Sequence, residues 1–233
     1  MIVEKIVNKS HKNVHLSSGE ILQSKTVILA TGARWRELNI PGERENLGKG
    51  VAYCPHCDGP FFKNKEVAVV GGGNSGVEAA LDLSGIAKKV SLIEFMPDLK
   101  ADQILVDKVK NSDNIEIFTN TKSKEVVSES GQVNGLLCEK RENSKEFLIP
   151  LEGIFVQIGL IPNSSFVKNL VKTTSYGEII IDESGRTSVE GIFACGDVTT
   201  IPYKQIVISM GEGAKTALTV ADYLMKDYAE VAA

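Results

Sequence analysis

The sequence predicts an α/β fold in which a unit built on a parallel sheet interrupts a second unit rich in short strands. An apolar strand over 66–70 ends in a run of glycines, a helical pattern follows over 77–83, and the next strand covers 90–94. Strands that alternate with helices in this way are typical of a parallel sheet covered by helices. Before residue 48 and after residue 159 this alternation is absent, and short strands separated by turns take its place.

The N-terminal segment alternates apolar and polar residues over 2–7, 13–16 and 20–22, with turn-forming residues between these stretches. This pattern predicts an antiparallel β-meander. A continuous apolar run over 26–30 predicts a strand that is buried on both faces. We assign these elements to a first domain, residues 1–47.

The central domain is predicted over residues 48–159. After the strand at 90–94, the pattern favours a helix at 102–110 and a strand at 115–118. Short strands are expected over 124–158, with breaks at 130–131 and 134–135, where a glycine follows a polar residue.

The last domain is predicted over residues 160–233. Its apolar runs favour strands at 177–182 and 191–194, and its periodicity favours a closing amphipathic helix at 211–225. The first and last domains are expected to form one unit that the central domain interrupts.

The composition bears on the classes of partner that can be expected. Among 233 residues, 26 basic side chains stand against 30 acidic ones, and the formal net charge is -4. This balance gives no reason to expect nucleic acid or a membrane surface as a partner. No basic and apolar leader opens the sequence, and no apolar run reaches the length of a membrane span. We therefore expect a cytoplasmic protein.

The glycine run has the spacing of a dinucleotide-binding turn. Gly71, Gly73 and Gly76 follow a strand and open a helix, so backbone amides can approach a pyrophosphate at the positive helix N-terminus. Asn74 and Ser75 lie inside the same turn and are predicted to contact the nucleotide.

Glu94 ends the following strand, where a ribose-binding acid is expected. A carboxylate accepts hydrogen bonds from ribose hydroxyls but repels a 2′-phosphate. Residues 95–98 supply no arginine to hold that phosphate, so the sequence favours NADH over NADPH.

Cys54 and Cys57 form a Cys-x-x-Cys pair just before this strand. Such a pair can be a redox disulfide, half of a zinc site or two inert thiols. No second pair or histidine motif completes a zinc site, so no metal is expected and redox chemistry is favoured. Asp58 is a candidate proton carrier, or a turn-forming residue without catalytic role. The remaining cysteines, Cys138 and Cys195, lie in apolar stretches and are expected to be buried core side chains.

Several segments match a known family. They cover 30–36, 53–60, 71–80, 153–163, 177–182, 192–197, 203–206 and 211–214. On these residues, nearly the whole chain resembles the C-terminal part of the low-molecular-weight thioredoxin reductases. Within that family, the proline and histidine between the cysteines favour the flavoprotein subunits of bacterial alkyl hydroperoxide reductases.

The resemblance implies a pyridine nucleotide-disulfide oxidoreductase. Electrons would pass from NADH through FAD to the Cys54–Cys57 disulfide and on to a thioredoxin-like domain or a peroxiredoxin, in peroxide detoxification and redox homeostasis. Cys57 would face the flavin, Cys54 would exchange with the partner, and the protein would be a homodimer. The residues implied to bind cofactor are Thr31, Gly32, Gly159, Gly196, Asp197, Lys204, Gln205 and Ile206.

The sequence departs from the family pattern at its start, because no strand with a Gly-x-Gly-x-x-Gly turn precedes residue 26. We therefore expect a Rossmann-like NAD-binding domain inserted into an N-terminally truncated FAD-binding domain, with weak FAD binding or none. The alternative is a nucleotide-binding fragment that keeps the NAD site and the dithiol but holds no stable flavin and does not turn over.

Overall fold

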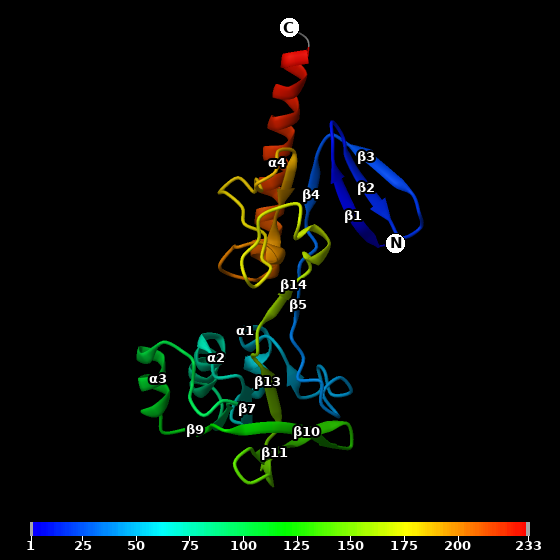
Figure 1. The fold of residues 1–233 in the computed structure, drawn as a ribbon. Coiled ribbons are helices and arrows are strands. Elements are labelled where there is room, and N and C mark those ends of the chain that lie inside the picture. Colours follow the sequence, from blue (N-terminus) through cyan, green and yellow to red (C-terminus); the bar gives the residue numbers. More distant parts are fainter. Residues whose placement is uncertain (1, 232–233) are drawn as a thin grey trace. The chain divides into compact units, whose positions relative to one another are not determined.

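The computed structural model describes residues 2–231, and side chains within the last helix are described as far as residue 226. Met1 and the last two residues of the predicted range 160–233 lie outside the described residues. The chain forms two compact units (Figure 1). Unit 1 contains residues 1–34 and 160–233, and unit 2 contains residues 35–159.

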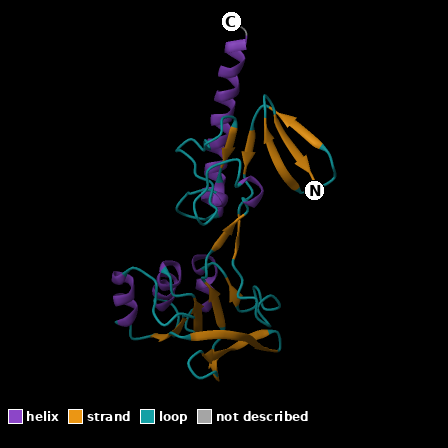
Figure 2. Ribbon diagram, in the orientation of Figure 1, coloured by secondary structure: helices purple, strands orange, loops and turns teal. Residues whose placement is uncertain are grey.

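Unit 2 is built on a five-stranded sheet with the order β6-β13-β7-β8-β9, and all its pairings are parallel. Its strands are β6 (Val51–Ala52), β7 (Glu66–Val70), β8 (Lys89–Ile93), β9 (Ile115–Phe118) and β13 (Gly153–Val156). The helices of this unit are α1 (Pro55–Asp58), α2 (Asn74–Ser84) and α3 (Gln103–Lys110), and a 3-10 turn, η1 (Gly59–Phe62), follows α1. These elements confirm the predicted α/β fold, which Figure 2 shows by element type.

Alternate residues of β7 serve the two faces of the sheet. Val67 and Val69 pack with Leu83 of α2 in one apolar cluster, whereas Ala68 packs with Leu136 in a second cluster. The second cluster is covered by an antiparallel sheet of three strands, β10 (Thr121–Glu129), β11 (Gln132–Lys140) and β12 (Lys145–Pro150). Burial on both faces explains the continuous apolar sequence of β7.

The break predicted at 134–135 is wrong. Gly135 lies inside β11, where it pairs with Val127 and Pro150. A side chain at this position would press on Leu148, which explains the glycine without a turn. The break at 130–131 is confirmed, because both residues have positive φ angles between β10 and β11.

Unit 1 begins with the predicted meander, which the structure confirms as an antiparallel sheet of β1 (Val3–Asn8), β2 (Lys12–Leu16) and β3 (Ile21–Ser24). β4 (Val27–Leu29) then pairs in parallel with β15 (Ile192–Ala194). The prediction that this strand is buried on both faces is wrong, because Ile28 is 38% exposed. Among the described residues, β15 is the only strand paired with β4.

The strand predicted at 177–182 is also wrong. Only Ile179 pairs there, through isolated bridges to Thr173 and Thr199, and the other residues of the segment have no regular secondary structure. The remaining elements of the unit are β14 (Leu160–Pro162), η2 (Ser165–Val167), η3 (Gly196–Val198), α4 (Ile206–Val231) and the first two residues of β5 (Ala33–Trp35), whose last residue belongs to unit 2. The closing helix α4 therefore begins five residues before the predicted start at 211.

Residues 35–47, which the sequence places in the first domain, cluster with unit 2 instead. The physical reason is a buried carboxylate. Glu43 is 1% exposed and accepts hydrogen bonds from the backbone of Leu38 and Asn39 and from the hydroxyl of Tyr53. The segment is thereby tied to the strand β6 that leads into the cysteine pair.

Candidate functional site

The residues of unit 2 that could bind a ligand or take part in a reaction lie at one edge of the parallel sheet. Carboxyl ends of parallel strands lie at the same edge, which is where ligands bind in open α/β sheets. Cys54 comes two residues after β6, Gly71 follows β7 and Glu94 follows β8. After β13, Gln157 donates from its amide to the carbonyl of Tyr53 at 2.7 Å, so the ends of β6 and β13 are joined by a side chain.

Cys54 and Cys57 are joined by a disulfide, with their Cα atoms 5.3 Å apart. Cys54 is the N-cap of α1, and its sulfur accepts a hydrogen bond from the backbone amide of Cys57 at 3.2 Å. Pro55 at the first helical position fits the fixed φ that a helix start requires. Cys57 is exposed and Cys54 half-buried, so outside reagents can reach the pair.

An apolar pocket of about 380 Å³ lies next to Cys54. Aromatic rings dominate its wall, and Asp58 is the single ionisable carboxylate among its lining residues. The lining residues are Trp35, Leu47, Gly48, Gly50, Val51, Ala52, Tyr53, Cys54, Asp58, Phe61 and Phe62. Phe61 is 75% exposed, so the pocket has an apolar rim.

Tyr53 forms one wall of this pocket, and the sequence did not predict this role. Its ring stacks on Trp35 with 6.0 Å between the ring centroids, and its hydroxyl donates to Glu43 at 2.9 Å. Burial, and then the carboxylate beside the hydroxyl, raise the pKa of Tyr53. The hydroxyl therefore stays protonated and holds the residue before Cys54 in place.

The glycine turn has the geometry that its spacing predicted. Gly71 has a φ of 126°, and a side chain there would collide with the carbonyl of Gln157. A side chain on Gly76 would collide with the carbonyl of Gly71, so the helix can approach the strand closely only with glycine here. Gly73, the N-cap of α2, faces open space. A ligand could therefore approach the backbone at Gly73 without obstruction.

Glu94 lies beside this turn. Its two carboxylate oxygens accept from the backbone amides of Gly72, at 2.5 Å, and Met96, at 2.7 Å. These bonds fix the carboxylate at the sheet edge and leave lone pairs for further donors.

The other residues predicted for this nucleotide site differ in their surroundings. Asn74 is engaged with Asp102, whose backbone amide donates to the Asn74 side chain at 2.8 Å. Ser75 is exposed. Gly159 has a φ of 102°, and its carbonyl accepts from the backbone amide of Arg36.

In unit 1, two residues predicted to contact flavin are held by a single partner. Asn163 donates from its side chain to the carbonyl of Thr31 and from its backbone to the carbonyl of Gly32. The Thr31 hydroxyl donates back to the carbonyl of Asn163 at 2.8 Å.

The second group in unit 1 surrounds the start of α4. Gly196 has a φ of 73° and lies against Ser209, whose hydroxyl donates to Asp197 at 2.8 Å. Lys204 is committed to Glu178, 3.1 Å away, and to the carbonyl of Thr199. The carbonyl of Gln205 accepts from the backbone amide of Ser209. The first residue of the helix, Ile206, is 83% exposed.

Cys138 and Cys195 are free and buried, as predicted. Burial raises the pKa of Cys138 to about 12, and burial followed by the charge of Glu212 raises that of Cys195. Both thiols therefore stay protonated, and redox chemistry rests with the disulfide. Within the described residues, no helix combines the length and the apolarity needed to cross a lipid bilayer.

A glycine turn and a disulfide at one edge of a parallel sheet define the class of nucleotide-dependent disulfide oxidoreductases. The chain belongs to the pyridine nucleotide-disulphide oxidoreductase family, whose sequence profile matches residues 2–220.

Two groups of relatives agree with this assignment. The chain is 55% identical to the F subunit of alkyl hydroperoxide reductase from Pseudomonas putida over 213 residues, which are 91% of this chain and 41% of that protein. It is also 55% identical to the corresponding protein of Staphylococcus aureus (strain MRSA252), over 92% of this chain and 42% of that protein. The chain thus spans less than half the length of these relatives.

Among solved structures, thioredoxin reductase from Streptococcus pyogenes MGAS5005 superposes with a TM-score of 0.90 at 38% identity, over 97% of this chain and 74% of that one. Thioredoxin reductase from Giardia duodenalis gives a TM-score of 0.90 at 31% identity, over 96% of this chain and 74% of that one. The resemblance to thioredoxin reductases inferred from the sequence is confirmed.

Proposed function

We propose that this chain carries the nucleotide site and the dithiol of an NADH-dependent flavin disulfide reductase whose electron acceptor is a thioredoxin-like domain or a peroxiredoxin. The observation that carries the proposal is the shared sheet edge, where the Cys54–Cys57 disulfide and the glycine turn both lie. The 55% identity to the F subunits of two alkyl hydroperoxide reductases supports the choice of a peroxide-reducing system.

In this proposal the pyrophosphate of NADH lies over the open backbone at Gly73, at the N-terminus of α2. Glu94 accepts hydrogen bonds from the ribose hydroxyls. Its carboxylate is already held by two backbone amides, so it cannot swing away from a 2′-phosphate, which supports NADH over NADPH.

Several residues of unit 1 fit the ring and ribityl parts of FAD. Thr31 and Gly32 are held at a strand end, Gly196 needs its positive φ, and Asp197 is oriented by Ser209. Ile206 offers an exposed apolar surface at the start of α4. When bound, FAD accepts a hydride from NADH and supplies two electrons to a disulfide.

The disulfide step conserves atoms and electrons: NADH and one proton reduce the Cys54–Cys57 bond to two thiols and yield NAD⁺. The Cys57 amide donates to the Cys54 sulfur, which favours a thiolate at Cys54 in the reduced pair. Cys54 would therefore attack the partner's disulfide, and Cys57 would be the sulfur that faces the flavin. Asp58, beside the same pocket, delivers the proton that a departing thiolate takes up.

The apolar pocket beside Cys54 supports docking of a protein partner. Thiol–disulfide exchange requires the partner's sulfur to reach Cys54, and an exposed Phe61 on the rim offers apolar contact at that point. A Phe61→Ala variant should raise the KM for a protein disulfide and leave the rate with a small aromatic disulfide unchanged. Equal loss with both acceptors would contradict the docking role.

The function is tested by following NADH oxidation with an aromatic disulfide reagent, with and without added FAD. The chain should consume NADH when FAD is supplied, and Cys54→Ser and Cys57→Ser should each abolish the activity while NADH still binds. Cys138→Ser is the matched control and should keep the activity. NADH consumption that survives loss of the redox pair would refute the electron path.

A second candidate is a nucleotide-binding fragment that keeps the NAD site and the dithiol but does not turn over. One observation favours it: within the described residues of unit 1, no strand runs through a glycine turn into a helix that could hold the FAD pyrophosphate. In that case the chain binds NADH, takes up no stoichiometric FAD and reduces no disulfide. Flavin absorbance of the purified chain, before and after incubation with FAD, separates the two candidates.

A further inference from the structure

The loop after β8 is fixed to the neighbouring strands by its backbone. The amide of Glu94 donates to the carbonyl of Phe118 at 2.8 Å, and the amide of Thr121 donates to the carbonyl of Glu94 at 3.0 Å. One step further, the amide of Asn120 donates to the carbonyl of Met96 at 2.9 Å. Phe95 lies between these anchored residues, so its backbone has little freedom to move.

A distant arginine reaches this loop through the antiparallel sheet. Thr121 pairs with Lys140 across β10 and β11, so Arg141 emerges beside the loop, where its amide donates to the carbonyl of Asn120. The guanidinium carbon of Arg141 lies 3.9 Å from the centroid of the Phe95 ring. The same group donates to the Phe95 carbonyl at 3.0 Å.

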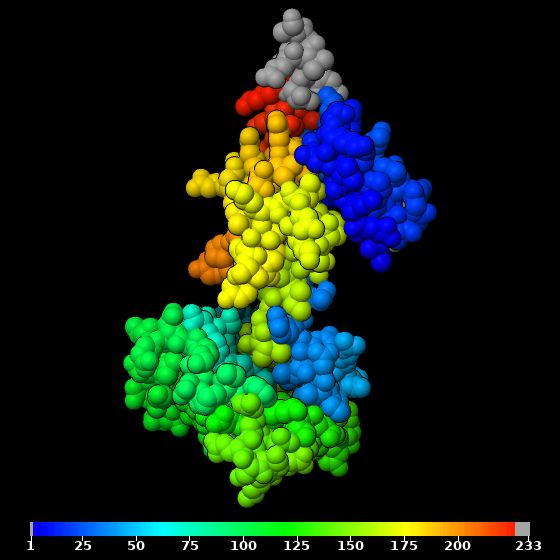
Figure 3. Space-filling view, viewed as in Figure 1, coloured from blue at the N-terminus to red at the C-terminus, as the bar shows by residue number. Residues whose placement is uncertain are grey.

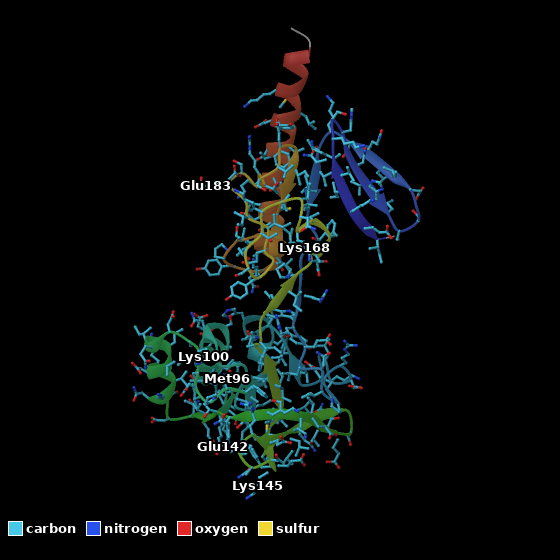
Figure 4. All side chains as sticks on the ribbon, in the orientation of Figure 1. Met96, Lys100, Glu142, Lys145, Lys168 and Glu183 are labelled. Carbon is cyan, nitrogen blue, oxygen red and sulfur yellow. A yellow bond between two sulfur atoms is a disulfide. The ribbon has the colours of Figure 1, made fainter. Side chains whose placement is uncertain are left out.

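These two contacts leave part of the Phe95 ring available. A planar guanidinium stacked on an aromatic ring covers one face of it, and Phe95 is still 48% exposed. In Figure 4, Met96 marks the loop after β8 and Glu142 marks the turn that follows Arg141. The space-filling view shows the green residues of this part of unit 2 as one continuous surface (Figure 3).

The proposed ribose site at Glu94 determines where the base of the nucleotide would lie. If Glu94 holds the adenosine ribose, the adenine is bonded to that same ribose and lies within a few ångströms of the carboxylate. Phe95 is the next residue along the chain, and nucleobases stack on aromatic rings. We propose that Phe95 forms the adenine-stacking surface of the nucleotide site and that Arg141 is the positioning residue that holds its ring. This inference rests on the proposed NADH site.

Arg141 could instead be a ligand for a 2′-phosphate, which would make the site specific for NADPH. The geometry favours the positioning role, because the guanidinium is already engaged with the ring and the carbonyl of Phe95. The carboxylate of Glu94 also stands on the same loop and would repel a phosphate.

The test measures binding of three nucleotides to the 233-residue chain: NADH, NADPH and reduced nicotinamide mononucleotide, which has no adenine. Phe95→Ala should weaken NADH binding about tenfold, the range that loss of one base–aromatic stack gives. Phe95→Tyr should bind NADH as the unaltered chain does. Arg141→Ala should weaken NADH binding by a smaller factor, about threefold, because the ring remains but is less ordered. The mononucleotide should bind all these proteins alike.

Arg44→Ala is the matched control, because Arg44 is an exposed arginine of the same unit whose partner is Glu37. If Phe95→Ala weakens the mononucleotide as much as NADH, the residue is merely structural and the proposal fails. If Arg141→Ala weakens NADPH binding and spares NADH, the arginine is a phosphate ligand and the proposal is overturned. Failure of the unaltered chain to bind NADH would refute the proposed function itself. Results with the variants bear only on the roles of Phe95 and Arg141.

Discussion

Glu43 offers a sharp test of how the segment before the cysteine pair is held. Its carboxylate is buried and accepts hydrogen bonds from three neutral donors. One oxygen accepts from Leu38 at 2.9 Å and from the hydroxyl of Tyr53 at 2.9 Å, and the other accepts from Asn39 at 2.7 Å. A Glu43→Gln substitution keeps the shape of the side chain but replaces one acceptor with a donor.

The cost of Glu43→Gln follows from this count. If the new oxygen serves Leu38 and Tyr53, the new amide group faces the Asn39 amide and is itself a buried donor without an acceptor. An unmatched buried donor costs about 1–3 kcal/mol. Glu43→Ala leaves all three donors unmatched, and we expect a loss of about 3–5 kcal/mol in the free energy of unfolding. The free energy of unfolding should therefore increase from Glu43→Ala to Glu43→Gln to the unaltered chain.

Urea unfolding measured by tryptophan fluorescence checks the prediction. The chain has a single tryptophan, Trp35, which stacks on Tyr53 and so reports on unit 2 close to the substitution. With a urea dependence of about 2 kcal/mol per molar, a loss of about 2 kcal/mol lowers the midpoint by about 1 M. Glu37→Gln breaks only an exposed ion pair with Arg44, worth about 1 kcal/mol at most, and should lower the midpoint by about 0.5 M or less. If the Glu43 and Glu37 variants unfold at the same urea concentration, the carboxylate does not hold this segment.

The remaining predictions concern the glycine turn and the buried thiols. Gly73→Ala should destabilise the protein by only about 0.5–1 kcal/mol, the cost of alanine at a helix N-cap, since a side chain there meets open space, yet it should weaken NADH binding about tenfold or more because that space is the proposed ligand path. Gly76→Ala should instead destabilise the protein by about 2 kcal/mol or more, because the new atom overlaps the carbonyl of Gly71; equal midpoints for the two variants would contradict this geometry. Burial raises the pKa of Cys138 to about 12 and raises that of Cys195, so at pH 8 both are thiols rather than reactive thiolates. An aromatic disulfide reagent should therefore titrate two sulfurs in the reduced native chain and four in urea; rapid labelling of four without denaturant would show that the burial is wrong.

Local periodicity was sufficient for much of the fold. The structure confirms two features that were predicted in this way: the unit of β7, the glycine turn and α2, and the N-terminal meander. Each is encoded by residues next to one another in sequence. β6 has only two residues, too few to show any period. The segment 177–182 has the apolar run of a strand, but a strand also needs a partner, and Ile179 alone finds one.

Some residues of the candidate site could likewise be predicted from the sequence, and others could not. The cysteine pair, the glycines and Glu94 could be found from the sequence, because each belongs to a short motif with fixed spacing. Gln157 and Arg141 could not, since they act on residues 104 and 46 positions away. Their contacts depend on the strand order and on the register of β11, which no local pattern contains.

The strand order also explains how one sheet edge can serve two chemistries. β13 separates β6 from β7, so the strand that leads to Cys54 and the strand that ends at Gly71 are two strand spacings apart, about 10 Å. In the proposed site the adenosine lies at the end of β8 and the pyrophosphate at the end of β7, so an extended dinucleotide would point its nicotinamide toward β13 and β6. The electron donor would then lie at the disulfide's end of the edge. A nicotinamide gives up a hydride, whereas a disulfide takes up an electron pair at sulfur, so the transfer needs a carrier that can accept a hydride and then donate an electron pair, as a flavin does. Removing that acceptor should therefore leave NADH binding and thiol exchange at Cys54 intact while uncoupling one from the other.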